Sequence, residues 1–256
     1  RRILVPLALA LAHVLPPPAA IAADGDPAVP IFAYHRFAPA VVDGMTVTTA
    51  TFESHLRYLA DHARPVVPLR ALVDWRRGRG PAPPPGAVVL TVDDGHRSVY
   101  ADMYPLVRRF HVPVTLFIYP SAIGVADYAM TWDQLRELAG SGFFDVQSHT
   151  WWHPNFKTEK RRLAPDEYRR FVTTQLERSR AILTRELGGA VDLLSWPFGI
   201  YDPELMALAG GAGYVAAVTI DGRPARARDD LLALPRYLMV DRYRGAAFER
   251  LLARER

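Results

Sequence analysis

Two adjacent carboxylates stand at the end of the most regular apolar run in the chain. Residues 88–92 read Val-Val-Leu-Thr-Val, which is typical of a buried strand, and Asp93, Asp94 and Gly95 follow directly. In α/β barrels the carboxyl ends of the strands are where catalytic groups collect. A strand followed by an Asp-Gly turn is also a common structural feature. The two aspartates are therefore a candidate catalytic site only if other residues of the chain complete it.

Two histidines four positions apart are such residues. Residues 143–148 form another strand-like run, and His149 and His153 follow it. If a helical turn begins there, both imidazoles lie on one face and can chelate a divalent ion. The alternative is that the two rings pack under a loop among the neighbouring aromatic side chains. No glutamate lies between the histidines, so a catalytic base must come from elsewhere.

These side chains divide into metal ligands and a base. Asp94 can complete a set of one carboxylate and two imidazoles, which leaves open positions for water and a substrate. Asp93, beside the metal but not bound to it, can take the proton from that water. The sequence contains no cysteine, so the ligands must be nitrogen and oxygen atoms. Zinc is the expected ion, and cobalt or nickel would suit the same donors.

A third strand-like run, residues 191–196, leads into Pro197, Phe198 and Gly199. Proline and glycine make such a turn rigid. Its backbone N–H groups, that of Phe198 for example, can face a developing oxyanion, and its aromatic ring can face a substrate. We expect these three residues to form an oxyanion and substrate rim.

Hydrolysis of an amide or an ester also needs an acid for the leaving group. No histidine follows His153, so the candidates lie upstream. Only His35 and His96 stand at the ends of strand-like runs, and both remain candidates for the acid. The others fall in or beside helical segments and are expected to be structural or exposed: His55, His62 and His111.

Strand-like and helix-like runs alternate along the chain. Strands are expected at residues 29–34, 65–67, 87–92, 114–119, 143–148, 191–196, 214–219 and 234–240. Helices are expected at residues 51–63, 132–139, 166–187 and 203–209. This alternation predicts a parallel sheet or barrel, and 256 residues are enough for one α/β domain.

Residues 1–23 have the composition of a secretory signal. Arg1 and Arg2 precede an apolar stretch, and small residues follow it near Ala22 and Ala23. The apolar stretch is short for a bilayer, so we expect cleavage and no permanent membrane span. Residues 24–256 would then form an exported catalytic domain, periplasmic or extracellular.

Composition and charge argue against a nucleic-acid partner. The chain is 50% hydrophobic and 23% charged, the ordinary balance of a folded globular protein. Its formal net charge is +4, but the basic residues are scattered and form only short runs, at residues 76–79 and 160–162. A nucleic-acid binder would concentrate them on one face.

Two of these motifs resemble those of the polysaccharide deacetylase family, the carbohydrate esterases that share the NodB homology domain. Residues 91–95, Thr-Val-Asp-Asp-Gly, are similar to the family's Thr-Phe-Asp-Asp-Gly motif, and residues 148–153, Ser-His-Thr-Trp-Trp-His, to its His-Ser/Thr-x-x-His motif. The resemblance covers residues 29–240. It implies a distorted (β/α) barrel of about seven parallel strands, with Asp93 as the base and Asp94, His149 and His153 as metal ligands.

The chain departs from the family pattern at two places. Residues 196–199 are similar to a third motif, but the arginine that many members carry just before this motif is absent. We expect Arg236 to replace that arginine in orienting Asp93. The late Leu-x-His motif is also missing. The branch that deacetylates poly-N-acetylglucosamine has a Tyr-His pair on its first strand that acts as the acid, and Tyr34-His35 resembles it. The resemblance favours His35 as the acid, with His96 as the alternative.

The resemblance implies a metal-dependent hydrolase that removes N-acetyl groups from a polysaccharide such as poly-N-acetylglucosamine and releases acetate. The same residues could instead cleave O-acetyl esters of a glycan, because the reacting carbonyl looks alike to the metal. A third possibility is a glycan-binding module of the same fold without turnover. The intact set of aspartates and histidines argues against that module.

Overall fold

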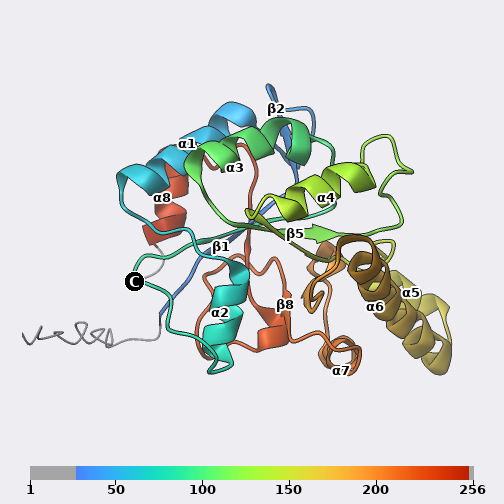
Figure 1. Ribbon diagram of the computed structural model, residues 1–256. Coiled ribbons are helices and arrows are strands. Elements are labelled where there is room, and N and C mark those ends of the chain that lie inside the picture. Colours follow the sequence, from blue (N-terminus) through green and yellow to red (C-terminus); the bar gives the residue numbers. More distant parts are fainter. Residues whose placement is uncertain (1–26, 254–256) are drawn as a thin grey trace, which may run out of the picture.

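Seven short parallel strands run through the centre of the molecule, and helices surround them (Figure 1). The computed structural model describes residues 27–253. The strands are β1 (Ile31–Tyr34), β4 (Val89–Val92), β5 (Val114–Ile118), β6 (Phe144–Ser148), β7 (Leu193–Ser195), β8 (Ala216–Val218) and β9 (Tyr237–Leu238). Their order in the sheet is β8-β7-β6-β5-β4-β1-β9. Strands that are neighbours in the sheet are mostly neighbours in the chain, as in repeated strand–helix units.

The last segment joins the two edges of this sheet. Leu234 bridges to Val218 of β8, and its N–H donates to the carbonyl of Ala217. Three residues later, β9 pairs with β1 in parallel. Residues 234–238 therefore curl the sheet into a distorted barrel. The predicted distorted (β/α) barrel of about seven parallel strands in one domain is confirmed.

Helices pack on the outside of the strands. They are α1 (Thr49–Asp61), α2 (Leu69–Arg76), α3 (Tyr104–Phe110), α4 (Trp132–Gly140), α5 (Phe156–Arg162), α6 (Pro165–Leu187), α7 (Pro203–Gly211) and α8 (Ala246–Leu252). Figure 1 shows α1, α3 and α8 along one side of the sheet and α2 and α7 on the other. A π-helical turn, η1 (Val99–Met103), precedes α3, and a small separate sheet pairs β2 (Arg36–Ala38) with β3 (Thr46–Thr48). Short 3₁₀ turns lie at η2 (Pro197–Gly199) and η3 (Leu231–Ala233).

Local sequence explains where several helices begin. Thr48 caps α1 by accepting a hydrogen bond from the Thr51 N–H, and Asp202 caps α7 in the same way through the Leu205 N–H. Thr131 and Gln134 form a reciprocal capping box at the start of α4. Such caps satisfy backbone N–H groups that have no partner inside the helix. These helices follow strands, so the caps also fix where each connection ends.

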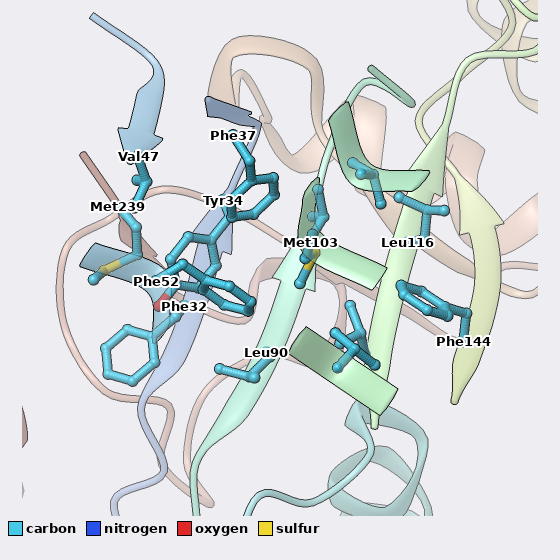
Figure 2. Close-up of a cluster of buried hydrophobic side chains, with 14 of the residues drawn as sticks. Phe32, Tyr34, Phe37, Val47, Phe52, Leu90, Met103, Leu116, Phe144 and Met239 are labelled. Atoms are coloured by element: carbon cyan, nitrogen blue, oxygen red, sulfur yellow. The ribbon is translucent and has the colours of Figure 1, made fainter. Parts of the chain in front are cut away.

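Alternation along the strands separates two apolar layers. Phe32 and Tyr34 of β1 point toward the helices, where they join the same cluster as Leu90 of β4 and Leu116 of β5 (Figure 2). The intervening residues, such as Ile31, belong to a second cluster that includes residues of α2. Successive side chains on a strand point to opposite faces, so every second residue faces the barrel interior. The same alternation continues into the polar residues that follow the strands.

Two expected strands differ from the structure. Residues 65–67 form only an isolated bridge, between Val66 and Val88, because Pro65 and the following Pro68 lack the N–H that a strand ladder uses. The run at 234–240 is a strand only at 237–238, since Leu234 turns to the opposite edge of the sheet. The expected signal segment, residues 1–23, lies outside the described residues. Within residues 27–253, no helix has the length and apolarity needed to cross a membrane.

His55 is a structural histidine on α1. Its Nδ1 accepts a hydrogen bond from the Tyr34 hydroxyl (2.9 Å), and its Nε2 donates to the Tyr243 carbonyl. The ring stacks on Phe248 with the centroids 4.1 Å apart. Burial lowers the pKa of His55 from 6.5 to about 4, an effect that the hydrogen bond to Tyr243 partly opposes. The folded protein therefore holds this imidazole neutral.

We predict a pH-dependent loss of stability from this residue. Its folded pKa lies below its unfolded pKa, so the unfolded chain binds the proton more readily, and stability falls as the pH drops from about 6.5 toward 4. Urea unfolding should show a His55 contribution that is about 2 kcal/mol smaller at pH 5.0 than at pH 7.5. His55→Gln should lose this part of the pH dependence. His62→Gln, at the end of the same helix, should retain it, and equal slopes for both variants would contradict the assignment.

Candidate active site

Strand register sets a layer of polar side chains at the carboxyl end of the barrel. The ladder of β1 and β4 ends with Tyr34 opposite Val92, and that of β5 and β6 with Ile118 opposite Ser148. The side chain of the next residue after each of these pairs points into the barrel, because side chains alternate between the two faces of a strand. These side chains therefore meet in the mouth of the barrel: His35, Asp93, Tyr119, His149 and Ser195.

Asp93 makes a bidentate ion pair with Arg236. The Arg236 Nη1 donates to Asp93 Oδ1 at 2.8 Å, and Nη2 donates to Oδ2 at 2.6 Å. Both side chains are almost fully buried, at 1% and 2% exposure. The structure thus places Arg236, the substitute considered from the sequence, in direct contact with the candidate base.

Arg236 uses its whole guanidinium in this position. Beyond the two bonds to Asp93, it donates to the Thr91 Oγ1 (2.9 Å), the Ser195 Oγ (2.8 Å) and the Thr219 carbonyl (2.9 Å). Ser195 in turn donates to Asp93 Oδ2 at 2.9 Å. A guanidinium has five N–H donors, so all five are satisfied. The carboxylate is fixed by Ser195 of β7 and by Arg236, which directly precedes β9.

Arg236 also controls the charge of Asp93. Burial by itself would raise the pKa of this carboxyl group, but the charge and hydrogen bonds of Arg236 outweigh burial and hold the pKa well below its ordinary value. Asp93 is therefore ionised at neutral pH. The ionised carboxylate can accept hydrogen bonds or a proton, and it has no proton to donate.

Asp94, His149 and His153 form a cluster that could hold a metal ion. One ligand atom from each lies within 4.8 Å of the others. Asp94 Oδ1 is 3.6 Å from His149 Nε2 and 3.9 Å from His153 Nε2. Three donors bound to one zinc ion at about 2.1 Å would lie about 3–3.5 Å apart, so small movements would bring them into range.

The orientation of the two histidines suits metal binding. His149 Nδ1 lies 2.7 Å from the Ser195 carbonyl, which can only accept, so Nδ1 carries a proton and Nε2 is the nitrogen turned toward Asp94. Burial and the neighbouring His149 lower the pKa of His153 to about 4, against the opposing effect of Asp94. A neutral imidazole is the form that binds a metal. The donor set therefore fits a divalent ion such as zinc.

Turns with strained backbone conformations orient the candidate ligand side chains. Six residues other than glycine have positive φ within residues 27–253, and four of them lie in the site: Asp94, Thr150, His153 and Phe198. Such conformations are costly and gather where function demands them. Asp94 is followed by Gly95, also at positive φ, where a Cβ would lie 2.8 Å from the Ile118 side chain. The turn therefore points Asp94 away from the direction that Asp93 takes.

The helical turn considered for residues 149–153 is wrong. The backbone bends there, with φ of 65° at Thr150 and 62° at His153, and α5 begins only at Phe156. The Thr150 Oγ1 holds the bend by accepting from the His153 N–H. Two left-handed residues, rather than helical spacing, bring the imidazoles together, with ring centroids 4.5 Å apart.

His35 follows β1 directly and lies near both carboxylates. It is half-buried, and its Nδ1 is buried without a hydrogen-bond partner among the described residues. Burial lowers the pKa of His35, while the charges of Asp93 and Asp94 act in the opposite direction. The ring thus favours its neutral form at neutral pH and has an unbonded Nδ1 beside the candidate metal site.

His96 lies in a cleft next to the cluster. The cleft has a volume of about 310 Å³ and is lined by Arg36, Asp94, His96, Tyr119 and Tyr128. His96 is engaged there, since its Nδ1 contacts the Ser98 hydroxyl at 2.8 Å. Burial, with the nearby Arg36, lowers the pKa of His96. The tyrosine hydroxyls of Tyr119 and Tyr128 bond to each other at 2.6 Å, which closes one wall of the cleft.

The rim residues border the cluster on another side. Pro197 is buried, whereas Phe198 is 55% exposed and its ring lies 4.5 Å from that of His153. A Cβ on Gly199 would lie 2.4 Å from the Ile220 side chain, so only glycine fits there. The structure places this turn next to a candidate metal ligand.

Several site residues were missed from the sequence. Ser195 and Thr91 orient Asp93 and Arg236, and Arg36, Tyr119 and Tyr128 line the cleft. Ser195 is the last residue of β7 and Tyr119 directly follows β5, so their positions at strand ends could have identified them as site residues. Arg36 and Tyr128 had no such signal, because only folding brings their connections together.

We predict strong energetic coupling between Asp93 and Arg236. Removing either charge leaves the other buried without its partner, so Asp93→Asn and Arg236→Met should each destabilise the protein, and the double variant should recover part of the loss. A double-mutant cycle by urea unfolding should give a coupling free energy of about 2 kcal/mol or more. The more exposed Glu53–Arg57 pair on α1, in which Glu53 also contacts Arg109, is the control and should give less than about 1 kcal/mol. Equal coupling in the two pairs would contradict this account.

Comparisons with known proteins agree with this geometry. Residues 80–217 match the polysaccharide deacetylase family. The YxkH protein of Bacillus subtilis (strain 168) is 25% identical over 221 residues, covering 86% of this chain and 74% of that protein. A poly-beta-1,6-N-acetyl-D-glucosamine N-deacetylase of Staphylococcus aureus (strain MRSA252) is 20% identical over 227 residues, covering 87% of this chain and 76% of that protein.

A solved structure shares the fold. The Streptococcus pyogenes deacetylase PplD, in complex with acetate, superimposes with a TM-score of 0.79 at 20% identity, covering 89% of this chain and 99% of that one. The family match alone spans more than half of the chain and includes the two aspartates and both histidines. The chain belongs to the polysaccharide deacetylase family.

Proposed function

We propose that this chain is a metal-dependent hydrolase that removes N-acetyl groups from a polysaccharide such as poly-N-acetylglucosamine. The observation that carries the proposal is a carboxylate held ionised by Arg236 directly beside a cluster of one aspartate and two histidines. Family membership supports a polysaccharide substrate. The Staphylococcus aureus relative, named for an N-deacetylase of poly-beta-1,6-N-acetyl-D-glucosamine, supports the choice of polymer.

Asp94, His149 and His153 would hold the metal, most simply zinc, with cobalt or nickel as ions that suit the same donors. When bound, a divalent ion would polarise the acetyl carbonyl and lower the pKa of a neighbouring water to about 7. His149 is held for this role by the Ser195 carbonyl, and the turn at Thr150 sets the direction of His153. The protein's part is to fix these donors and leave the cleft side open.

Asp93 would act as the general base. It is ionised, and Arg236 and Ser195 hold both of its oxygens, so its orientation is set before a substrate arrives. Its Oδ2 lies 3.8 Å from His149 Nε2, close to the cluster without being one of its three donors. A positioned base of this kind contributes about 10²–10⁴-fold to a rate. Asp93 and Asp94 thus serve as base and ligand.

His35 would act as the acid that protonates the leaving nitrogen. It lies in the same layer as Asp93, and its Nδ1 is buried without a hydrogen-bond partner among the described residues. Because burial lowers its pKa, a proton that reaches this ring is readily given up again. His96 is the alternative, but its Nδ1 is already engaged by Ser98. The rim of Pro197, Phe198 and Gly199 would face the acetyl oxyanion and the sugar.

We also propose that the protein is exported to the periplasm or the extracellular space. The support is the charge, apolar stretch and small residues of segment 1–23, which would be removed to leave residues 24–256 as the catalytic domain. An exported enzyme would encounter a matrix polysaccharide in that location.

We predict that the two acid candidates can be separated by the leaving group. An amide needs a proton on its nitrogen, whereas an activated acetyl ester leaves without one. His35→Asn should lower kcat/KM for an N-acetylated oligomer by about 100-fold and have a much smaller effect on an activated ester. His96→Asn should not show this selectivity. If His96→Asn shows the amide-selective loss and His35→Asn does not, the acid is His96.

We predict that product analysis will identify the bond that is cleaved. Incubation with poly-N-acetylglucosamine should release acetate and create primary amines in equal amounts, and Asp93→Asn should release about 10²–10⁴-fold less. Release of acetate from an O-acetylated xylan without new amines would indicate an esterase instead. Binding of either polymer without any acetate release would indicate a glycan-binding module.

A further inference from the structure

Exposed apolar side chains gather on the face of the molecule that carries the site. Within residues 27–253, every exposed large apolar side chain lies in a connection that follows the carboxyl end of β1, β5, β6, β7 or β8. They are Val41, Val42, Met45, Val125, Tyr128, Trp152, Phe198 and Ile220. Water-exposed apolar groups confined to one face indicate that this face contacts something large.

One part of this face is a groove with aromatic walls. It has a volume of about 460 Å³ and is lined by Trp151, Trp152, Glu167, Arg170 and Phe171, among others. Trp152 stands one position before His153, so the connection that carries both histidines also forms the wall of the groove. The opposite wall comes from α6. The groove therefore begins one residue along the chain from a candidate metal ligand.

The aromatic walls are held in place. The backbone N–H of Trp152 donates to the side-chain oxygen of the buried Gln175 at 3.1 Å. The Arg178 guanidinium lies 3.5 Å from the centre of the Trp151 ring, and Phe171 meets Trp152 edge to face at 5.9 Å. Trp152 nonetheless remains 39% exposed. A fixed, exposed aromatic ring offers contact area at little entropic cost.

The chemistry of the groove suits a sugar unit. A pyranose has an apolar C–H face that packs on an aromatic ring and hydroxyl groups around its edge that both donate and accept hydrogen bonds. The groove offers the rings of Trp152 and Phe171, with the Arg170 guanidinium as donor and the Glu167 carboxylate as acceptor. A nucleic acid would favour a uniformly positive groove, which the carboxylate opposes.

The groove and the cleft lie on successive parts of the barrel rim. The cleft takes its residues from the connections after β1, β4 and β5, and the groove takes its residues from the connection after β6 and from α6. The candidate metal ligands come from both sets of connections, since Asp94 follows β4 and both histidines follow β6. Both features thus lie on the same rim of the barrel, which is the arrangement that one polymer chain contacting both would need.

We propose that the groove of Trp152 and Phe171 binds a sugar unit of the same polysaccharide, at a distance along the chain from the unit that loses its acetyl group. This inference rests on the proposed function and adds a length requirement to it. Long oligomers gain the groove contact, whereas short ones reach only the cluster and cleft. The enzyme would then act within long chains in preference to short fragments.

The test compares substrates of different length. For wild type and Trp152→Ala, kcat/KM is measured on long and short β-1,6-linked N-acetylglucosamine oligomers and on a small activated acetyl ester. Trp152→Ala should reduce the ratio of long-oligomer to short-substrate kcat/KM by about tenfold, mainly through KM. Trp152→Tyr should restore most of the ratio, because it keeps an aromatic face. Metal content of each variant shows whether the neighbouring His153 still binds.

A second element supplies an independent variant and a control. Phe171→Ala, on α6, should reduce the same ratio without touching the connection that carries the histidines. Arg185→Ala, on the same helix but outside the groove, should leave the ratio unchanged. If both aromatic variants lower activity equally on long and short substrates, the groove inference is overturned while the deacetylase function stands.

Direct binding separates the inference from the function. Calorimetric titration of the protein with the long oligomer should give an affinity that Trp152→Ala and Phe171→Ala each weaken about tenfold. This result, together with no acetate release from any oligomer, would support the groove and contradict the proposed reaction. Undiminished affinity in both variants would overturn the groove inference whatever the activity.

Discussion

The buried ion pair between Arg236 and Asp93 is the interaction on which the rest of the structure depends. Arg236 stands in the segment that joins the two edges of the sheet, between the bridge of Leu234 to β8 and the pairing of β9 with β1. Its five hydrogen bonds reach residues at the ends of β4, β7 and β8. Burying two charges is costly unless every donor is satisfied, as it is here. The segment that closes the barrel therefore also orients the carboxylate that we propose as the base.

This arrangement also explains how two adjacent aspartates come to differ. Asp93 continues the inward parity of β4 into the buried network, whereas Asp94 adopts positive φ and turns toward the two histidines. One carboxylate is surrounded by Arg236 and Ser195, and the other faces the cleft. Backbone geometry, rather than side-chain chemistry, assigns the two positions. The rim residue Phe198 then borders the cluster beside His153.

The sequence predicted the parts of the site that depend on local pattern. The strands that lead into Asp93 and His149 were predicted from apolar runs. Their alternation with helices predicted a parallel sheet or barrel, and the family resemblance specified the distorted barrel. Features that depend on distant contacts were not predicted in this way. The network of Arg236 spans 143 residues to Asp93, and the bend at Thr150 replaces the helical turn considered for the histidines. The cleft tyrosines likewise meet only after connections of different strands fold together.

The central claim is that Asp94, His149 and His153 hold the one metal ion that the reaction needs. The most direct measurement titrates zinc into chelator-treated protein while following both bound metal and acetate release. The account predicts that activity is absent at first, rises in proportion to bound zinc and levels off at one ion per chain. It also predicts that His153→Ala abolishes both signals. Full acetate release from protein without metal, or unchanged zinc binding in that variant, would contradict the account.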